Sequence, residues 1–65
     1  MHPIRFGRKK LMWTQDHLAN YFGLSKSTIS NWEKGKVKIP FDLLQEMEMV
    51  FGNPRLRADI DAYKV

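Results

Sequence analysis

Residues 14–40 read TQDHLANYFGLSKSTISNWEKGKVKIP, and they contain two short amphipathic helix patterns that meet at Gly23. The second pattern, over about residues 26–34, has Ile29 and Trp32 as its apolar anchors, three positions apart. That spacing places both side chains on one face of a helix. A helix with so narrow an apolar stripe presents most of its side chains to something outside the domain.

Helix start and stop signals divide this stretch. Thr14 and Ser25 carry hydroxyls that can accept the first free backbone N–H groups of a helix, so each is expected to begin one. Gly23 and Gly35 can adopt the left-handed conformation that ends a helix. The first of the two helices has an apolar face formed by Leu18, Ala19 and Phe22. The sequence therefore predicts a helix, a tight turn and a second helix within about residues 14–34.

Further apolar patterns on both sides predict three more helices. Residues 3–11 form the first, in which Gly7 stands where an apolar side chain is expected, so we expect a close approach from another helix there. Pro40 suits the first turn of the next, and residues 54–63 form the last. The fourth helix has the strongest pattern, with Leu43, Leu44, Met47, Val50 and Phe51 on its apolar face. We predict an all-α fold, a compact bundle of about five short helices in a single domain over residues 1–65.

Length and composition exclude several classes of protein. A chain of 65 residues without cysteine has no disulfide and no thiolate metal site, and its two histidines, His2 and His17, have no clustered carboxylates beside them. No nucleophile, base and orienting group can be assembled, so we expect no enzyme activity, no cofactor, no metal and no small-molecule ligand. No apolar run is long enough to span a membrane. We expect a cytoplasmic protein.

Charge is distributed unevenly along the chain, whose formal net charge is +4. Residues 1–38 hold eight basic side chains against two acidic ones, whereas residues 39–65 hold three against five. The positive half is therefore the half that contains the two central helices. A concentration of positive charge on one surface favours a nucleic-acid partner. Charge alone is also compatible with a basic domain that is simply soluble.

Over about residues 4–51 the chain resembles the Cro/phage-repressor, or XRE-type, helix-turn-helix family of DNA-binding regulators. It departs from the family pattern at Gly7, where an aliphatic residue is usual, and at Met12, where glycine often ends the first helix. The resemblance implies a lambda-repressor-like fold and a double-stranded DNA partner, in a bacterial or phage-infected cell and close to the nucleoid. The matching residues are Arg8, Thr14, Gln15, Leu18, Ala19, Gly23, Leu24, Ser25, Ser27, Thr28, Ile29, Ser30, Trp32, Glu33, Gly35 and Pro40.

The same resemblance implies which side chains face DNA. The first residues of the third helix and one residue a turn later would face base edges, which here are Lys26, Ser27 and Asn31. Lysine can donate to guanine and asparagine can pair bidentately with adenine. Thr28 is expected to reach a base methyl group or a phosphate. Arg8 and Glu33 resemble a family pair that joins the first helix to the end of the third. Phosphate contacts are expected from Gln15, Ser25, Ser30, Lys34, Lys36 and Lys38.

A short recognition helix reads few base pairs, so we expect a weak homodimer on a pseudo-palindromic operator. The expected dimer surface, on the last helix, consists of Leu56, Ile60, Tyr63 and Val65. This expectation assumes that the first four helices close the core by themselves; alternatively, the last helix only covers the first and fourth. The predicted function is a sequence-specific regulator, a Cro-like repressor of a phage or mobile element. The alternatives are an antitoxin or protein-interaction module on the same fold, and a non-specific nucleic-acid binder.

Overall fold

Two of the caps expected from the sequence, Thr14 and Ser25, begin helices in the structure. A computed structural model describes residues 1–35 and 37–63, and this part of the chain contains five helices and no strand. Thr14 Oγ1 accepts the backbone N–H of His17 at 3.0 Å, and Ser25 Oγ accepts that of Thr28 at 3.2 Å. Gly23 is left-handed, with φ of 69°. The all-α prediction is confirmed, with helices α1 (Pro3–Lys10), α2 (Gln15–Phe22), α3 (Lys26–Glu33), α4 (Phe41–Phe51) and α5 (Leu56–Ala62).

The core takes one fully buried side chain from each helix. All five of these side chains belong to a single cluster, and they are Ile4, Leu18, Ile29, Met47 and Leu56. Around them pack the buried side chains of Ala19, Trp32, Leu44 and Phe51. Because every helix contributes a buried side chain, displacement of any one helix would expose the core to solvent.

The position of Leu56 corrects the expected dimer surface. Leu56 is fully buried, and α5 packs against both α1 and α4. The first four helices therefore do not close the core by themselves, and Leu56 is not available to a partner. Ile60 is partly buried against the same core, and the ring of Tyr63 lies edge-on to that of His2, with centroids 4.9 Å apart. Val65, the remaining residue of that prediction, lies outside the described residues.

Two departures from the family pattern in and after α1 have clear structural correlates. An added Cβ on Gly7 would lie 2.7 Å from two ring atoms of Phe51, so the close approach expected at Gly7 comes from a side chain of α4. Met12 is left-handed with φ of 62° and is 92% exposed. It occupies the conformation that glycine adopts most easily.

The N-cap of α1, the imidazole of His2, was not predicted from the sequence. His2 is buried, and its Nδ1 accepts the backbone N–H of Ile4 at 3.1 Å at the start of α1. Burial lowers the pKa of His2 below its ordinary value, against an opposing effect of the negative charge of Glu33. A neutral imidazole is what this cap requires, because a protonated Nδ1 cannot accept a hydrogen bond.

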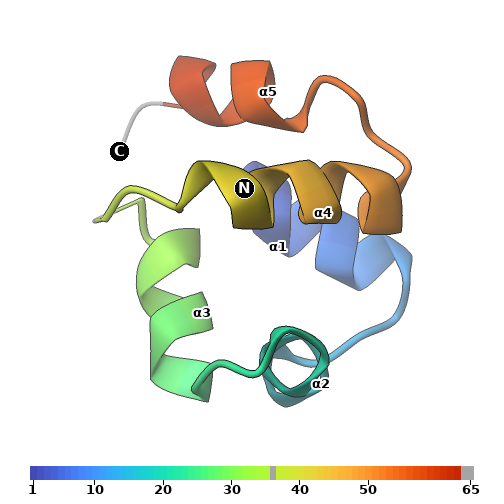
Figure 1. The fold of residues 1–65 in the computed structure, drawn as a ribbon, viewed down its shortest axis with the longest axis vertical. Helices are drawn as coiled ribbons and strands as arrows, with labels where there is room; N and C mark the ends of the chain where they lie inside the picture. The colour runs from blue at the N-terminus through green and yellow to red at the C-terminus, as the bar shows by residue number, and fades with distance from the viewer. Residues whose placement is uncertain (36, 64–65) are drawn as a thin grey trace.

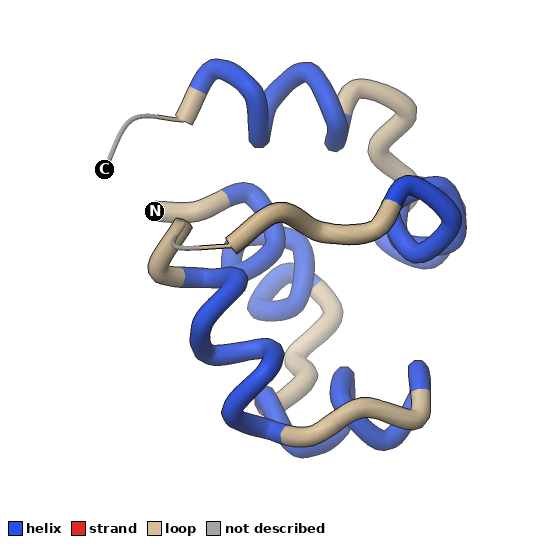
Figure 2. The backbone as a smooth tube through the Cα atoms, turned by 60° about the vertical axis from the view of Figure 1, so that its left-hand side comes forward, coloured by secondary structure: helices blue, strands red, loops and turns tan. Residues whose placement is uncertain are grey.

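The helices are arranged so that α3 has a free outer face. α5 lies at one end of the molecule and α2 at the opposite end, with α1 and α4 between them (Figure 1). α3 runs along one side, from its N-terminus near α2 towards the level of α1 and α4 (Figures 1 and 2). None of the helices in the described ranges has the length and hydropathy that a membrane crossing needs.

Candidate nucleic-acid interface

The outward face of α3 is polar and forms a shallow concavity with the start of α2. Ile29 and Trp32 are the buried residues of α3, and they point into the core. Lys26, Ser27 and Asn31 are exposed on the other side. The concavity is lined by Gln15, Lys26, Ser27, Ser30, Asn31 and Lys34. The structure therefore brings together six of the residues that sequence analysis assigned to DNA.

Two other predicted contacts are occupied within the protein. Ser25 Oγ caps α3 and also lies 2.9 Å from Thr28 Oγ1 and 3.3 Å from Ser27 Oγ. Thr28 is half-buried, and neither Ser25 nor Thr28 lines the concavity on α3. Their hydroxyls can still share a hydrogen bond with a ligand, because a hydroxyl has two acceptor positions. Their first role in the structure is to begin the helix.

Lys34 and Lys38, two of the three lysines predicted to follow the DNA backbone, line different concavities. Lys34 is the C-cap of α3 and lines the concavity with Gln15. Lys38 lines a different groove, together with residues of α4 and α5 such as Phe41 and Ile60. Lys36 lies outside the described residues. Of these three predicted phosphate contacts, the structure brings Lys34 to the outward face of α3.

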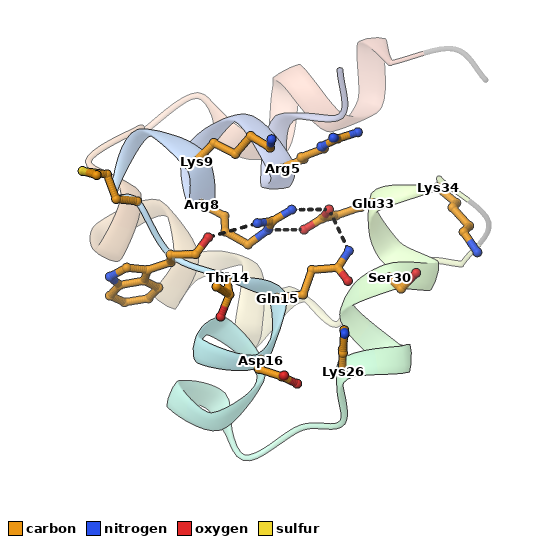
Figure 3. A pocket seen from close by; sticks show the side chains of 12 residues that line it. Arg5, Arg8, Lys9, Thr14, Gln15, Asp16, Lys26, Ser30, Glu33 and Lys34 are labelled. Atoms are coloured by element: carbon orange, nitrogen blue, oxygen red, sulfur yellow. Dashed lines mark hydrogen bonds and ion pairs between the residues drawn. The ribbon is translucent and has the colours of Figure 1, made fainter.

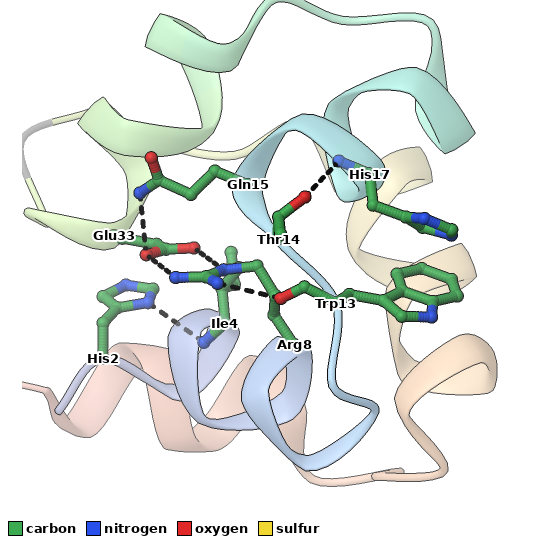
Figure 4. A network of polar contacts seen from close by, with 8 residues as sticks. All are labelled: His2, Ile4, Arg8, Trp13, Thr14, Gln15, His17 and Glu33. Carbon is green, nitrogen blue, oxygen red and sulfur yellow. Dashed lines mark hydrogen bonds and ion pairs between the residues drawn. The ribbon is translucent and has the colours of Figure 1, made fainter.

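A network of buried polar groups joins the three N-terminal helices (Figure 4). Arg8 donates from Nε to Glu33 Oε2 at 2.7 Å and from Nη2 to Glu33 Oε1 at 3.0 Å. Arg8 Nη1 donates to the carbonyl of Trp13 at 3.0 Å, and Gln15 Nε2 donates to Glu33 Oε1 at 3.1 Å. The side chains of Arg8 and Glu33 are 10% and 6% exposed. The hydrogen bond to Glu33 raises the pKa of Arg8 above its ordinary value, so the guanidinium stays charged.

This network fixes the end of α3 and occupies the amide of Gln15. A bidentate pair restrains both the distance and the orientation of its two planes. Through Glu33 it ties the last turn of α3 to α1, and through Gln15 to the first turn of α2. The amide group of Gln15, which was expected to hold a phosphate, already donates one of its two hydrogens to Glu33. One amide hydrogen is left for an external acceptor.

The polar network forms the floor of a second, larger concavity between α1 and α3 (Figure 3). Arg5 and Lys9 stand on the α1 side, and Lys26 and Lys34 on the α3 side. Neither Arg5 nor Lys9 was predicted from the sequence to belong to a site. The available signal was their spacing of four residues, which places them on the same helical face as Arg8. Their position opposite α3 depends on helix packing.

The described residues contain no group of three or more side chains of the kind that ligate a metal ion. A protein-family model described as "Helix-turn-helix" matches residues 4–55, which is most of the chain. No curated protein and no solved structure matches the chain. The matched region begins in α1 and ends just before α5, so it contains both concavities and the complete polar network.

Proposed function

The chain belongs to the Cro/C1-type, or XRE, helix-turn-helix family of DNA-binding regulators, and on this premise we propose that it is a sequence-specific transcriptional repressor of a phage or mobile element. It would insert α3 into the major groove of an operator and exclude polymerase or another regulator. The observation that carries the proposal is the division of α3, in which Ile29 and Trp32 are buried while Lys26, Ser27 and Asn31 are exposed. A helix of this kind offers donors and acceptors to base edges without loss of core packing.

The proposed base contacts follow from the chemistry of the exposed side chains. Lys26, in the first turn of α3, can donate to O6 or N7 of guanine. Asn31, further along the same concavity, can pair bidentately with N6 and N7 of adenine, a contact that gives about 1 to 3 kcal/mol of discrimination. Ser27 can either donate or accept, and Thr28 can contact a thymine methyl group. Gln15 and Lys34 flank the face and suit phosphate contacts.

We also propose that the active form is a weak homodimer, with two recognition helices about 34 Å apart on a pseudo-palindromic site. The surface that supports this proposal is the groove between the α3–α4 connection and α5, where Ile60 and Tyr63 lie beside the half-exposed side chains of Val37 and Phe41. Charges of both signs border the groove, from Lys38, Arg57 and Asp61. A border of this kind is compatible with a second copy of the same surface across a two-fold axis.

The experiment that tests this function is selection of bound duplexes from a random DNA pool, followed by affinity measurements on the winner and a scrambled duplex at two salt concentrations. A pseudo-palindromic winner bound at least about 10³-fold more tightly than the scrambled duplex supports a specific dimeric regulator. If no motif emerges and all affinities fall equally with salt, the protein is an electrostatic binder.

Variants on α3 separate base reading from general binding. Asn31→Ala is expected to weaken binding to the selected operator by about 5- to 150-fold for each bound subunit, which corresponds to about 1–3 kcal/mol per contact, and to leave scrambled DNA unchanged. Asn20→Ala is the matched control, because Asn20 is also an exposed helical asparagine and does not line the concavity. If changes at Lys26 and Asn31 are harmless while Tyr63→Ala abolishes binding of a protein partner, the chain is an interaction module such as an antitoxin.

A further inference from the structure

The concavity between α1 and α3 has basic side chains on both of its walls. Arg5 and Lys9 come from α1, one helical turn apart, and both are exposed. Lys26 and Lys34 come from the two ends of α3 and line the same concavity on its α3 side (Figure 3). The two walls are far apart in the sequence, so only the folded protein brings these four basic side chains together.

The floor of this concavity cannot supply a net charge, because its charged groups neutralise each other. The carboxylate of Glu33 accepts two hydrogen bonds from Arg8 and one from Gln15. The guanidinium of Arg8 uses its third nitrogen on the carbonyl of Trp13. Once this pair is set aside, the charged side chains that line the concavity are four basic ones and Asp16. The free positive charge is therefore on the walls.

The shape of the concavity favours an extended ligand. A small anion is held by several donors that converge on one point, whereas here the four free basic side chains are distributed along two helices. A chain of phosphates that runs between the walls can meet donors on both sides. Double-stranded DNA offers such a chain on each side of its major groove, with one negative charge per about 1.7 Å of helix axis.

We propose that the concavity between α1 and α3 receives one sugar-phosphate strand of the bound DNA, and that Arg5 and Lys9 contact its phosphates from the α1 side. This inference rests on the proposed function, because it needs α3 in the adjoining groove. On the α3 side the same strand meets Lys34 and Ser30, which line both concavities. The DNA interface then includes α1 as well as the two central helices.

Phosphate contacts have a signature that base contacts lack. Each neutralised phosphate contributes about 0.9 to the slope of log K against log salt. Replacement of Arg5 and Lys9 by glutamine is therefore expected to reduce that slope by about 1.8 for each bound subunit, and by about 3.6 for a bound dimer. At 0.15 M salt the same relation corresponds to a loss of affinity of about 5-fold for each contact and about 30-fold for the two contacts of one subunit. The loss is the same for operator and scrambled DNA, because phosphates carry no sequence information.

The test compares the double variant Arg5→Gln/Lys9→Gln with a control of equal net charge, Lys10→Gln/Arg55→Gln. Lys10 is exposed on α1 but lines a different cavity, with Phe6 and Phe51, and Arg55 is exposed at the start of α5. Affinity for operator and scrambled duplexes is measured at four or more salt concentrations. Thermal unfolding of each variant confirms that it is folded at the temperature of the binding assay.

For each bound subunit, we expect the slope to fall by about 1.8 in the Arg5/Lys9 variant and by less than about 0.5 in the control. Equal changes in both variants would mean that net charge alone is responsible, and an unchanged slope in both would mean that α1 does not touch DNA; either result overturns the proposal. Operator selectivity separates this inference from the proposed function. If the unmodified chain binds its operator specifically but the Arg5/Lys9 variant shows an unchanged salt slope, only the α1 contact is refuted. If the unmodified chain does not bind any sequence specifically, the proposed function is refuted.

Discussion

Replacement of Glu33 by glutamine is expected to destabilise the domain strongly, although it changes one atom of the side chain. The guanidinium of Arg8 would keep its charge in a position where the side chain is 10% exposed, and it would lose the carboxylate that accepts two of its hydrogen bonds. Removal of one partner from a buried ion pair costs about 3 to 5 kcal/mol. A glutamine oxygen can still accept one bond from Arg8, so we expect about 3 kcal/mol.

This loss is large for a protein of 65 residues. The total free energy of unfolding of a chain this long is about 3 to 10 kcal/mol. A loss of about 3 kcal/mol lowers the melting temperature by about 12 to 24 °C in a domain of this size. Urea unfolding followed by far-ultraviolet circular dichroism measures the change in free energy. DNA affinity is then measured at a temperature where the Glu33→Gln variant is folded, and we expect it to be lower, because the last turn of α3 is no longer held to α1.

A control variant and a double-mutant cycle test whether the Arg8–Glu33 pair causes this loss of stability. Glu46→Gln is the matched control, since Glu46 is an exposed glutamate on α4 and should change stability by less than about 0.5 kcal/mol. In a double-mutant cycle, Arg8→Gln/Glu33→Gln should lose less stability than the sum of the single variants, with a coupling of about 0.5 to 3 kcal/mol. If Glu33→Gln behaves like Glu46→Gln in both stability and DNA affinity, the pair does not hold α3 in place.

Four further outcomes are expected from the packing and the backbone. Gly7→Ala should destabilise by about 1 to 3 kcal/mol despite its higher helix propensity, because its Cβ would lie 2.7 Å from the ring of Phe51; adding Phe51→Leu should recover part of the loss in chemical denaturation. Met12→Gly should stabilise by about 0.5 to 1 kcal/mol, since it relieves a left-handed residue with φ of 62°, and an unchanged midpoint in thermal unfolding would contradict this. Burial lowers the pKa of His2, so below the ordinary value of about 6.5 the unfolded chain binds a proton that the folded chain excludes; stability measured in urea should fall as the pH drops from about 7 to 5, and by less in His2→Asn, which keeps a capping side chain without a titratable ring. Leu56→Ala should cost about 2 to 5 kcal/mol in the same assay, and a loss under about 1 kcal/mol would mean that α5 is not part of the core.

Helix positions could be predicted from the sequence because their signals are local. Thr14 and Ser25 act as caps within three residues of their own position, and Gly23 ends α2 through its own φ. Such signals do not depend on the rest of the fold. The cap at His2 was missed because an imidazole is not among the usual capping side chains, and its acceptor nitrogen is available only while burial keeps the ring neutral.

Features that depend on packing between helices could not be predicted in the same way. The pattern of α5 shows that Leu56 belongs to an apolar face, but it does not show whether that face meets the core or a second copy. In the same way, Gly7 indicates a close approach but does not show that the contacting side chain is Phe51. The spacing of Arg5 and Lys9 places them on one helical face but does not show that this face lies beside α3. The outward residues of α3 were predictable because a narrow apolar stripe determines the opposite face of any helix.

The two faces of α3 should allow DNA affinity and stability to be changed separately in this protein. Lys26 and Asn31 are exposed, and neither forms a side-chain hydrogen bond within the described part of the chain. Their substitution should change the free energy of unfolding by less than about 0.5 kcal/mol, so a loss of DNA affinity cannot come from unfolding. Glu33 differs, because it lies on α3 and is also buried against α1. Ile29 and Trp32 are the buried residues of α3, and the bidentate pair adds a directional restraint at its last turn, so substitutions at Glu33 should change stability and DNA affinity together.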